Sequence, residues 1–300
     1  MATKRMTVDG REIDVSNLDK ILFPEVGLTK GDLIDYATRI ADIALPHLKD
    51  RPLTMQRFPD GIDDEGFYQK DVPDYFPDWI DRVELDKESG TVTHVVANRA
   101  ATLVYLANQA CITLHAALSR ADRIDFPDRL VFDLDPSDDD FSKVRFAALK
   151  IHEILEGAGL TCFVQTTGSR GMHVVVPLDR SEPFDDVRAF AHDLGRHLAD
   201  AYPDELTVEQ RKSKRGSRLF IDYLRNAYGQ TSVAPYSVRA KSGAPVATPL
   251  DWHEVEDSGL GPQDFTVGNV FRRLGQKDDP WCDIAEHARS LGGARRALSL

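Results

Sequence analysis

The segment Leu-Val-Phe-Asp-Leu-Asp-Pro, from Leu130 to Pro136, constrains the fold more than any other part of this chain. An apolar run that a proline ends is typical of a buried β-strand. Side chains alternate between the two faces of a strand, so Asp133 and Asp135 emerge on the same face. Because close like charges repel unless a cation intervenes, the segment predicts a strand whose end holds a divalent metal ion. A phosphatase-type nucleophile strand also carries two such aspartates, but Pro136 and Ser137 fit that pattern poorly.

A second motif, Thr166-Thr-Gly-Ser-Arg-Gly-Met-His173, combines a glycine-containing turn with hydroxyl, guanidinium and imidazole groups. Most turns of this kind simply join two strands. Here an apolar strand begins at His173 and would fix its imidazole beside the turn. The Ser169 hydroxyl, the Arg170 guanidinium and the backbone N–H groups are donors suited to triphosphate oxygens. The motif therefore indicates an anion cradle.

A third motif ends the apolar run Leu219-Phe-Ile-Asp222 with another carboxylate. A lone aspartate in this position is usually a turn or cap residue, but after the Asp133 strand it favours a shared two-metal site. The preceding stretch, Arg211–Arg218, packs five cations into eight residues. It is either a solvated hairpin tip or a phosphate contact, and the sequence leaves both readings open.

Three further positions have both a structural and a functional reading. Arg239 ends a short run, Pro235-Tyr-Ser-Val-Arg239, and is a surface or a phosphate-binding arginine. His115 closes an apolar segment and is a core or a catalytic histidine. Phe67 and Tyr68 follow a Pro-Asp-Gly turn. One of the two rings can pack in the core, and the other is free to stack on a base, a contact that contributes about 1–3 kcal/mol to binding.

The net charge and the cysteine content exclude several classes of function and of structural site. The net charge of −12 argues against nonspecific coating of nucleic acid, although it allows a local basic groove. The three cysteines, Cys111, Cys162 and Cys282, form neither a CxxC zinc site nor a disulfide framework. The sequence has no membrane-spanning run and no signal-peptide pattern, which predicts a cytoplasmic, nucleoid-associated protein without a membrane partner.

The pattern of elements predicts an α+β fold rather than a doubly wound sheet, because helices and strands do not alternate regularly. We expect helices capped by Thr29 and Ser142, a buried helix from Asn98 to about Leu114, and a helix that Pro183 opens. Strands are expected at 161–166, 172–177 and 218–223, and residues 52–97 are expected to be β-rich, with a turn at Glu88-Ser-Gly90.

Four segments, in this order, resemble one family: Phe132-Asp-Leu-Asp-Pro136, Gly168-Ser-Arg-Gly-Met-His173, Phe220-Ile-Asp-Tyr-Leu-Arg-Asn226 and Ala234-Pro-Tyr-Ser-Val-Arg239. They are similar to the polymerase domain of bacterial DNA ligase D and its stand-alone archaeal relatives, in the archaeo-eukaryotic primase superfamily. The resemblance implies a primase-like catalytic core with mixed and antiparallel sheets flanked by helices. It also implies a single domain over residues 1–300: a 5′-phosphate-binding part to about 50, a catalytic core at about 51–260 and a peripheral helical segment at about 261–300.

The resemblance also implies roles for individual residues. It implies that Asp133, Asp135 and Asp222 bind two divalent ions, Mn²⁺ by preference or Mg²⁺. One ion would activate a primer 3′-hydroxyl and the other would neutralise the triphosphate. It further implies nucleotide binding by Ser169, Arg170, His173 and Arg239, and a catalytic role for His115. Thr167 and Ser169 are candidates for the residue that selects the 2′-hydroxyl.

On the DNA side, Lys20 and Lys30 match two lysines that bind a downstream 5′-phosphate, and Phe67 and Tyr68 match rings that stack on template bases. Arg57 matches a DNA-binding arginine. The chain departs from many relatives at three places. Gln56 replaces a basic residue, Arg170 replaces a lysine, and Ala116-Ala-Leu-Ser119 lacks a tryptophan found after the family's histidine.

The function that the resemblance implies is template-directed gap filling at broken DNA ends during non-homologous end joining, with NTPs, preferably ribonucleotides, or dNTPs as substrates. No adenylating lysine motif is apparent, so we expect a stand-alone polymerase, or a fragment of a longer one, that works with Ku and a separate DNA ligase. Three alternatives remain open: a primase that starts chains de novo, a phosphoesterase with an Asp-x-Asp motif, and a non-catalytic DNA-end-binding module.

Overall fold

The computed structural model describes residues 3–87 and 89–300, and its chain divides into two compact units. Unit 1 comprises Met1–Asp122, Val233–Ala247 and Phe265–Gly275; unit 2 comprises Arg123–Ser232, Thr248–Asp264 and Gln276–Leu300. The chain passes from one unit to the other five times, after Asp122, Ser232, Ala247, Asp264 and Gly275. The expected division into one domain with three parts stays a prediction.

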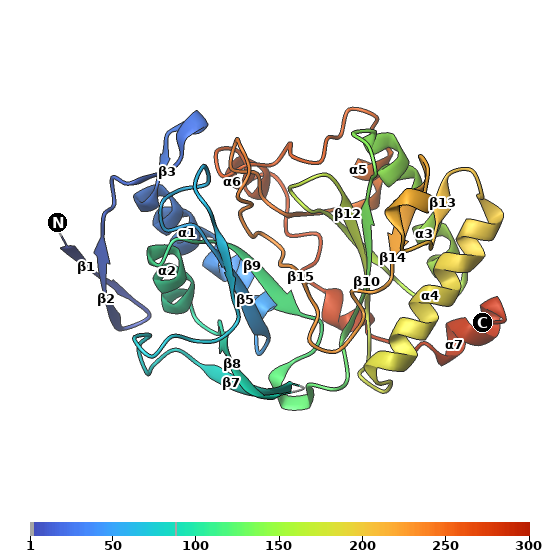
Figure 1. The fold of residues 1–300 in the computed structure, drawn as a ribbon, viewed down its shortest axis with the longest axis horizontal. Helices are drawn as coiled ribbons and strands as arrows, with labels where there is room; N and C mark the ends of the chain where they lie inside the picture. The colour runs from blue at the N-terminus through green and yellow to red at the C-terminus, as the bar shows by residue number, and fades with distance from the viewer. Residues whose placement is uncertain (1–2, 88) are drawn as a thin grey trace. The chain divides into compact units, whose positions relative to one another are not determined.

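Unit 1 is built on an antiparallel sheet with the order β15-β9-β5-β8-β7, in which β6 also pairs with β5 (Figure 1). The strands of this sheet are β5 Pro52–Arg57, β6 Phe67–Gln69, β7 Arg82–Lys87, β8 Gly90–Val96 and β9 Cys111–Ala117, and the edge strand β15 Thr231–Val233 spans the point where the chain re-enters unit 1. Two further two-stranded sheets consist of β1 Thr3–Val8 with β2 Arg11–Ser16 and of β3 Ile21–Phe23 with β4 Leu28–Thr29. Its helices are η1 Pro24–Val26, α1 Lys30–Leu48, α2 Ala100–Asn108, η2 Ala121–Arg123 and α6 Val270–Leu274.

Helix α1 begins as the sequence predicts. The Thr29 hydroxyl accepts a hydrogen bond from the Asp32 backbone N–H, and the Asp32 carboxylate accepts one from the Thr29 N–H, which is a complete capping box. The helix buries Tyr36, whose hydroxyl donates to the Tyr236 carbonyl at 2.7 Å. That bond ties the first segment of unit 1 to the segment that returns more than a hundred residues later.

The expected buried helix from Asn98 to Leu114 is wrong in its second half. Helix α2 ends at Asn108, Ala110 takes a left-handed conformation with φ of 54°, and strand β9 begins at Cys111. The apolar residues after Ala110 pair with β5, where His115 lies opposite Thr54. His115 is therefore a strand residue, because partners distant in sequence decide the conformation of this apolar run. The expected turn at Glu88 includes a residue outside the described part of the chain.

Unit 2 contains a six-stranded sheet with the order β13-β14-β10-β12-β11-β16. Its pairs are antiparallel except β13 with β14. Its strands are β10 Arg129–Asp135, β11 Phe163–Thr166, β12 Met172–Pro177, β13 Leu206–Thr207, β14 Leu219–Asp222 and β16 Thr248–Leu250. Its helices are α3 Phe141–Gly157, α4 Phe184–Ala201, η3 Lys212–Lys214, α5 Trp252–Glu256, η4 Ile284–His287 and α7 Gly292–Leu298.

Helices α3 and α4 pack against this sheet, and both start close to their predicted positions (Figure 1). Pro183 precedes α4 as predicted. For α3 the cap is Asp140 rather than Ser142, because the Asp140 carboxylate accepts the Ser142 N–H at 3.0 Å. The two largely antiparallel sheets with separate helices confirm an α+β fold. Among the described helices, none combines the length and apolar character needed to cross a membrane.

Candidate active site

Strand β10 places Asp133 beside a functional side chain of each neighbouring strand. In the ladder, Asp133 lies opposite Asp222 of β14 and opposite His173 of β12, and His173 lies opposite Gln165 of β11. Residues directly opposed on antiparallel strands point to the same face of the sheet. Asp222, Asp133, His173 and Gln165 therefore form one line of side chains, called the cross-strand row below.

Hydrogen bonds fix the orientation of the row. The Arg225 Nε donates to Asp133 Oδ2 at 3.1 Å and lies 3.7 Å from Asp222 Oδ2. The Gln165 Nε2 lies 3.2 Å from His173 Nδ1, and His173 Nε2 lies 3.5 Å from Asp133 Oδ1. With the Gln165 amide in this orientation Nδ1 accepts, which places an N–H on Nε2, where it faces Asp133.

The two carboxylates of the row have opposite electrostatic environments. Burial opposes ionisation of Asp133, but His173 and Arg225 outweigh burial and lower its pKa to about 2. Asp222 has a raised pKa because of its burial and because of the negative charge of Asp133. Only 15% of the Asp133 side chain and 20% of the Asp222 side chain are exposed. Two carboxylates this close and this buried form a site that favours a cation of more than one charge.

The third predicted metal ligand, Asp135, has a different partner. Its side chain is half exposed, and Arg170 Nη2 donates to its Oδ2 at 3.1 Å. The structure thus brings Asp133 and Asp222 together in the row and joins Asp135 to the predicted phosphate-binding arginine. Both members of this outer pair are open to solvent, so either can change partner at little cost.

The turn between β11 and β12 is held by its own hydrogen bonds. The Thr167 Oγ1 donates to the Gly171 carbonyl at 3.1 Å and accepts from the Ser169 N–H at 3.3 Å. A Cβ on Gly171 would lie 2.1 Å from the Leu134 carbonyl oxygen, so only glycine allows the turn to lie this close to β10. The turn is therefore fixed beside Asp135, with Ser169 half-buried and Arg170 exposed.

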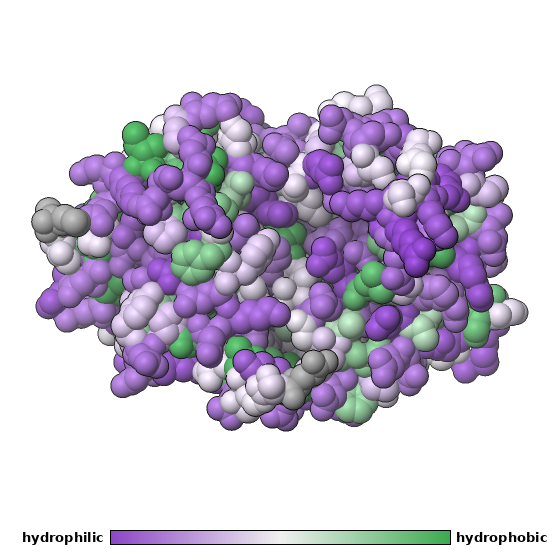
Figure 2. Space-filling view, viewed as in Figure 1, coloured by the Kyte–Doolittle hydropathy of each residue, from purple (hydrophilic) through white to green (hydrophobic). Residues whose placement is uncertain are grey.

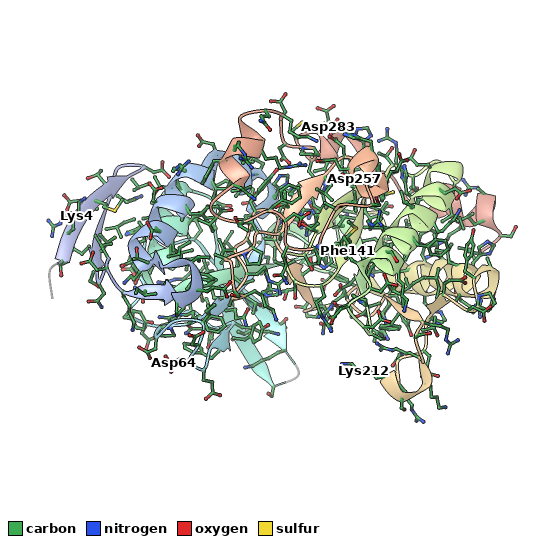
Figure 3. The ribbon with its side chains drawn as sticks, turned by 90° about the horizontal axis from the view of Figure 1, so that it is seen from above. Lys4, Asp64, Phe141, Lys212, Asp257 and Asp283 are labelled. Atoms are coloured by element: carbon green, nitrogen blue, oxygen red, sulfur yellow. The ribbon has the colours of Figure 1, made fainter. Side chains whose placement is uncertain are left out.

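The basic loop Arg211–Arg218 projects into solvent at its tip, which agrees with the first of the two readings that its sequence left open. Figure 3 shows Lys212 at the far end of a projecting loop, with its side chain in solvent. Arg215 stacks on Phe220 at 3.9 Å and donates to the Glu209 carbonyl at 2.8 Å. Arg218 donates to the Arg215 carbonyl at 2.9 Å. Arg215 and Arg218 thus support the loop, whereas Lys212 and Lys214 are exposed.

In unit 1 the two predicted 5′-phosphate ligands lie close together. The Lys30 N–H donates to the Lys20 carbonyl at 2.8 Å. The pKa of the Lys30 ammonium is lowered by burial and by the charge of Lys20. Lys20 pairs with Asp60 at 2.6 Å. Figure 2 shows hydrophobic surface over the β3 and η1 region beside these lysines, where Ile21 is 52% exposed.

A second group in unit 1 contains the aromatic residues. Phe67 and Tyr68 are 45% and 61% exposed, so neither ring is part of the core, although the sequence allowed one of them to be. The Tyr68 ring meets the His115 ring edge-on, with 5.7 Å between centroids. Arg57 lies over the Phe67 ring at 5.5 Å and donates to Gln69 at 2.7 Å. The two rings are thus held on one side and open on the other.

The predicted site residues fall into two groups, one in each unit. Unit 1 holds His115, Arg239, Lys20, Lys30, Phe67, Tyr68 and Arg57; unit 2 holds Asp133, Asp135, Asp222, Ser169, Arg170, His173 and Thr167. Arg239 is half-buried, and its N–H donates to the Pro245 carbonyl at 2.7 Å. Reasoning from the sequence did not single out Arg225 and Gln165. The spacing of Arg225, three residues after Asp222, was the available signal for the first.

Comparison with known protein families shows which family the chain belongs to. Residues 29–281 match the family model described as LigD, primase-polymerase domain. The chain belongs to this family. LigD of Bacillus subtilis is 34% identical over 275 residues, which are 91% of this chain and 44% of that protein. LigD of Mycobacterium tuberculosis H37Rv is 31% identical over 280 residues, 90% of this chain and 36% of that protein.

The likeness extends to a solved structure, the polymerase domain of Mycobacterium tuberculosis ligase D in complex with DNA. It matches with a TM-score of 0.86 and 30% identity, over 92% of this chain and 99% of that one. The primase-like fold and the enzyme class, a nucleotidyltransferase of a metal-dependent family, are thereby confirmed. This LigD family chain spans less than half the length of the curated relatives named above.

Proposed function

We propose that the chain is a template-directed polymerase that fills short gaps at broken DNA ends in non-homologous end joining. It would transfer nucleotides from NTPs to a primer 3′-hydroxyl and prefer ribonucleotides. The observation that carries the proposal is the largely buried pair Asp133 and Asp222, which Arg225 joins in the cross-strand row. The names of the relatives, which are end-joining proteins, support the pathway.

The donor set fits a hard divalent cation. Asp133 and Asp222, with Asp135 nearby, would hold Mn²⁺ or Mg²⁺ through carboxylate oxygens. When bound, such ions lower the pKa of an attacking hydroxyl and neutralise triphosphate charge. In their absence Arg225 supplies the positive charge between the carboxylates. The Asp135–Arg170 pair would separate, so that Asp135 joins the ligand set and Arg170 is released for phosphate.

The nucleotide would be held from the turn between β11 and β12. The Ser169 hydroxyl and the Arg170 guanidinium are the donors for triphosphate oxygens, with Arg239 as a third. His173 presents its Nε2–H at the face that carries Asp133 and is suited to the nucleotide as well. The Thr167 hydroxyl is committed to the turn, which leaves Ser169 as the better candidate for contact with the 2′-hydroxyl.

The DNA would be bound by unit 1. Lys20 and Lys30 supply two adjacent positive charges for a downstream 5′-phosphate. Phe67 and Tyr68 offer exposed rings for template bases, Arg57 supports Phe67, and His115 steadies Tyr68. Ku and a separate DNA ligase are the partners that this role requires, and the nucleoid is the place where it would act.

Extension of a primer across a short gap with a 5′-phosphate tests the proposal. The assay compares ribo- with deoxyribonucleotides, with Mn²⁺ or Mg²⁺, in the parent chain and in Asp135→Ala. Template-directed addition that is lost in the variant is expected. No addition under any condition, with retained binding to the 5′-phosphate, would replace the proposal with an end-binding module. Synthesis on unprimed single strands would instead identify a primase.

A further inference from the structure

A second group of metal-ligating side chains lies in unit 2, outside the cross-strand row. His152 and Glu156 lie one helical turn apart on α3, and Cys162 follows that helix just before β11. The His152 Nδ1 lies 3.4 Å from Cys162 Sγ and 4.0 Å from Glu156 Oε1. One ligand atom from each of the three residues lies within 4.8 Å of the other two.

The group is negatively charged around its histidine. Glu156 and Glu256, the last residue of α5, both act on the His152 imidazole, whose pKa burial nevertheless lowers. Within residues 3–87 and 89–300, neither glutamate forms an ion pair with a lysine or an arginine. A neutral imidazole, a thiol and two carboxylates without a cationic side chain are suited to an external cation.

The ligands are also held in place before any ion binds. The Trp252 ring stacks on the His152 ring, with 3.9 Å between centroids and 8° between planes. The Trp252 Nε1 donates to the Cys162 carbonyl at 2.8 Å. The stacked ring keeps the imidazole plane fixed, and the hydrogen bond holds the backbone that carries the thiol. The Nδ1 atom therefore stays directed at the sulfur.

The distances agree with one class of ion. Bonds of about 2.3 Å to sulfur and about 2.0–2.1 Å to nitrogen, at tetrahedral angles, separate the two ligand atoms by about 3.6 Å. The observed separation of Nδ1 and Sγ is 3.4 Å. The Glu156 oxygen is slightly too distant, but its side chain is 46% exposed and free to approach. A ligand set of thiol, imidazole and carboxylate favours Zn²⁺ over Mg²⁺.

We propose that His152, Glu156 and Cys162 form a Zn²⁺ site, distinct from the carboxylates of the cross-strand row, that fastens the end of α3 to the start of β11. Binding would release the thiol proton to solvent and replace the contact between His152 Nδ1 and Cys162 Sγ with two metal bonds. Glu256 or a water molecule is suited to the fourth position. The site would stabilise unit 2 without taking part in nucleotide transfer.

Titration with Co²⁺ tests the site, because a cobalt–thiolate bond gives a near-ultraviolet charge-transfer band that carboxylate ligands do not give. The protein carries Asp133→Ala and Asp222→Ala, so that the cross-strand row contributes no binding. We expect one equivalent of Co²⁺ to produce the band, Zn²⁺ to abolish it, Cys162→Ser to lose it and the exposed-cysteine control Cys282→Ser to keep it. No band, or a band that survives Cys162→Ser, would overturn the proposal.

A second measurement covers the case in which Cys162→Ser fails to fold. Glu156→Gln changes an exposed side chain on the surface of α3 and leaves the core untouched. We expect it to weaken Zn²⁺ binding, measured by competition with a chromogenic chelator, by at least about tenfold. Zn²⁺ should raise the melting temperature of the protein with intact Glu156 more than that of the variant. Equal Zn²⁺ affinity in both would count against the site.

Discussion

At the scale of single residues, Asp133 and Asp222 show how neighbouring side chains shift the pKa values of two similar carboxylates in opposite directions. Both are aspartates in the same row, yet the pKa of Asp133 is lowered and that of Asp222 is raised. The difference arises because Asp133 contacts both Arg225 and His173, whereas Asp222 has Arg225 at a longer distance. The Asp133 carboxylate is therefore stabilised as an anion, whereas the Asp222 carboxylate needs a further positive charge nearby to be stabilised in the same way.

This asymmetry predicts opposite effects of two similar substitutions in the absence of metal. Asp133→Asn should lower the free energy of unfolding by about 2 kcal/mol, because it leaves Arg225 without its nearest carboxylate. Asp222→Asn keeps an acceptor for the Leu224 N–H and removes a like charge, so it should raise the free energy of unfolding by up to about 1 kcal/mol. Urea unfolding measures both. Both should abolish primer extension, and equal destabilisation by the two would refute the charge assignment.

The pKa of Asp133 also predicts a pH dependence. It is lowered from 3.8 to about 2, so the folded state favours the ionised form. The resulting stabilisation is complete well above pH 3.8 and is lost as the pH falls towards the folded pKa of about 2. The difference in unfolding free energy between the parent and Asp133→Asn should therefore shrink over this range. A constant difference between pH 6 and about pH 2 would contradict the linkage.

The sequence was sufficient to predict that Asp133 and Asp222 lie together, but not which side chains surround them. A pair two residues apart on a strand is a local pattern, and so is the hydroxyl-rich turn that precedes His173. The contacts of Arg225 and Gln165 depend instead on the order of β14, β10, β12 and β11 in the sheet. That order follows from long-range packing, which no local spacing reveals.

At the scale of elements, the site depends on how closely one turn approaches one strand. Gly171 lies against the Leu134 carbonyl, and Leu134 separates the two aspartates of β10. Any side chain at this position would push the β11–β12 turn and the end of β10 apart. Because Arg170 and Asp135 lie on the two sides of this contact, their pairing depends on it.

Gly171→Ala should therefore destabilise the fold by about 2–4 kcal/mol, since the new Cβ would lie 2.1 Å from backbone oxygen. Gly157→Ala is the matched control. It lies at the end of α3 with nothing within 4 Å of the added Cβ, and it should be neutral or stabilise by up to about 1 kcal/mol. Thermal unfolding of both variants checks the prediction, and similar melting temperatures for the two would disprove the close approach.

Elements were predictable where local signals were strong. The capping box at Thr29 and the proline before α4 each marked a helix start. The region after Asn98 was misread because α2 and β9 are both apolar and are separated only by Gln109 and Ala110. Pairing with β5 makes the second part a strand, and periodicity within the segment carries no information about that partner.

At the scale of the whole molecule, neither unit is a continuous piece of chain. The two later segments of unit 1 contribute buried core residues that include Ala234, Tyr236, Val238, Ala244, Val246 and Val270. A fragment of residues 1–122 should therefore not fold alone, because it lacks these side chains and the Tyr236 carbonyl that Tyr36 bonds. Circular dichroism and amide-proton dispersion of the fragment test this. A cooperative unfolding transition in the fragment would refute it.

The acidic balance of the whole chain makes its few basic sites decisive for DNA binding. With a net charge of −12, affinity should come from Lys20 and Lys30 acting on a 5′-phosphate. Replacing both with alanine should weaken binding to a gap that carries this phosphate by about tenfold or more, and change binding to an unphosphorylated gap little. The control, Lys4→Ala with Lys87→Ala, makes the same change in net charge. Equal losses on both substrates would point to nonspecific attraction.

The five passages of the chain between the units have a consequence for recombination with LigD relatives. A chimera with one crossover always assembles at least one unit from two parents, wherever the crossover is placed. Exchanging an intact unit 2 requires three separate inserts joined at all five passages. Gene shuffling by single crossovers will therefore produce units whose cores combine residues of both parents, instead of exchanging whole units. Which chimeras fold will depend on how well the core residues of the two parents pack together.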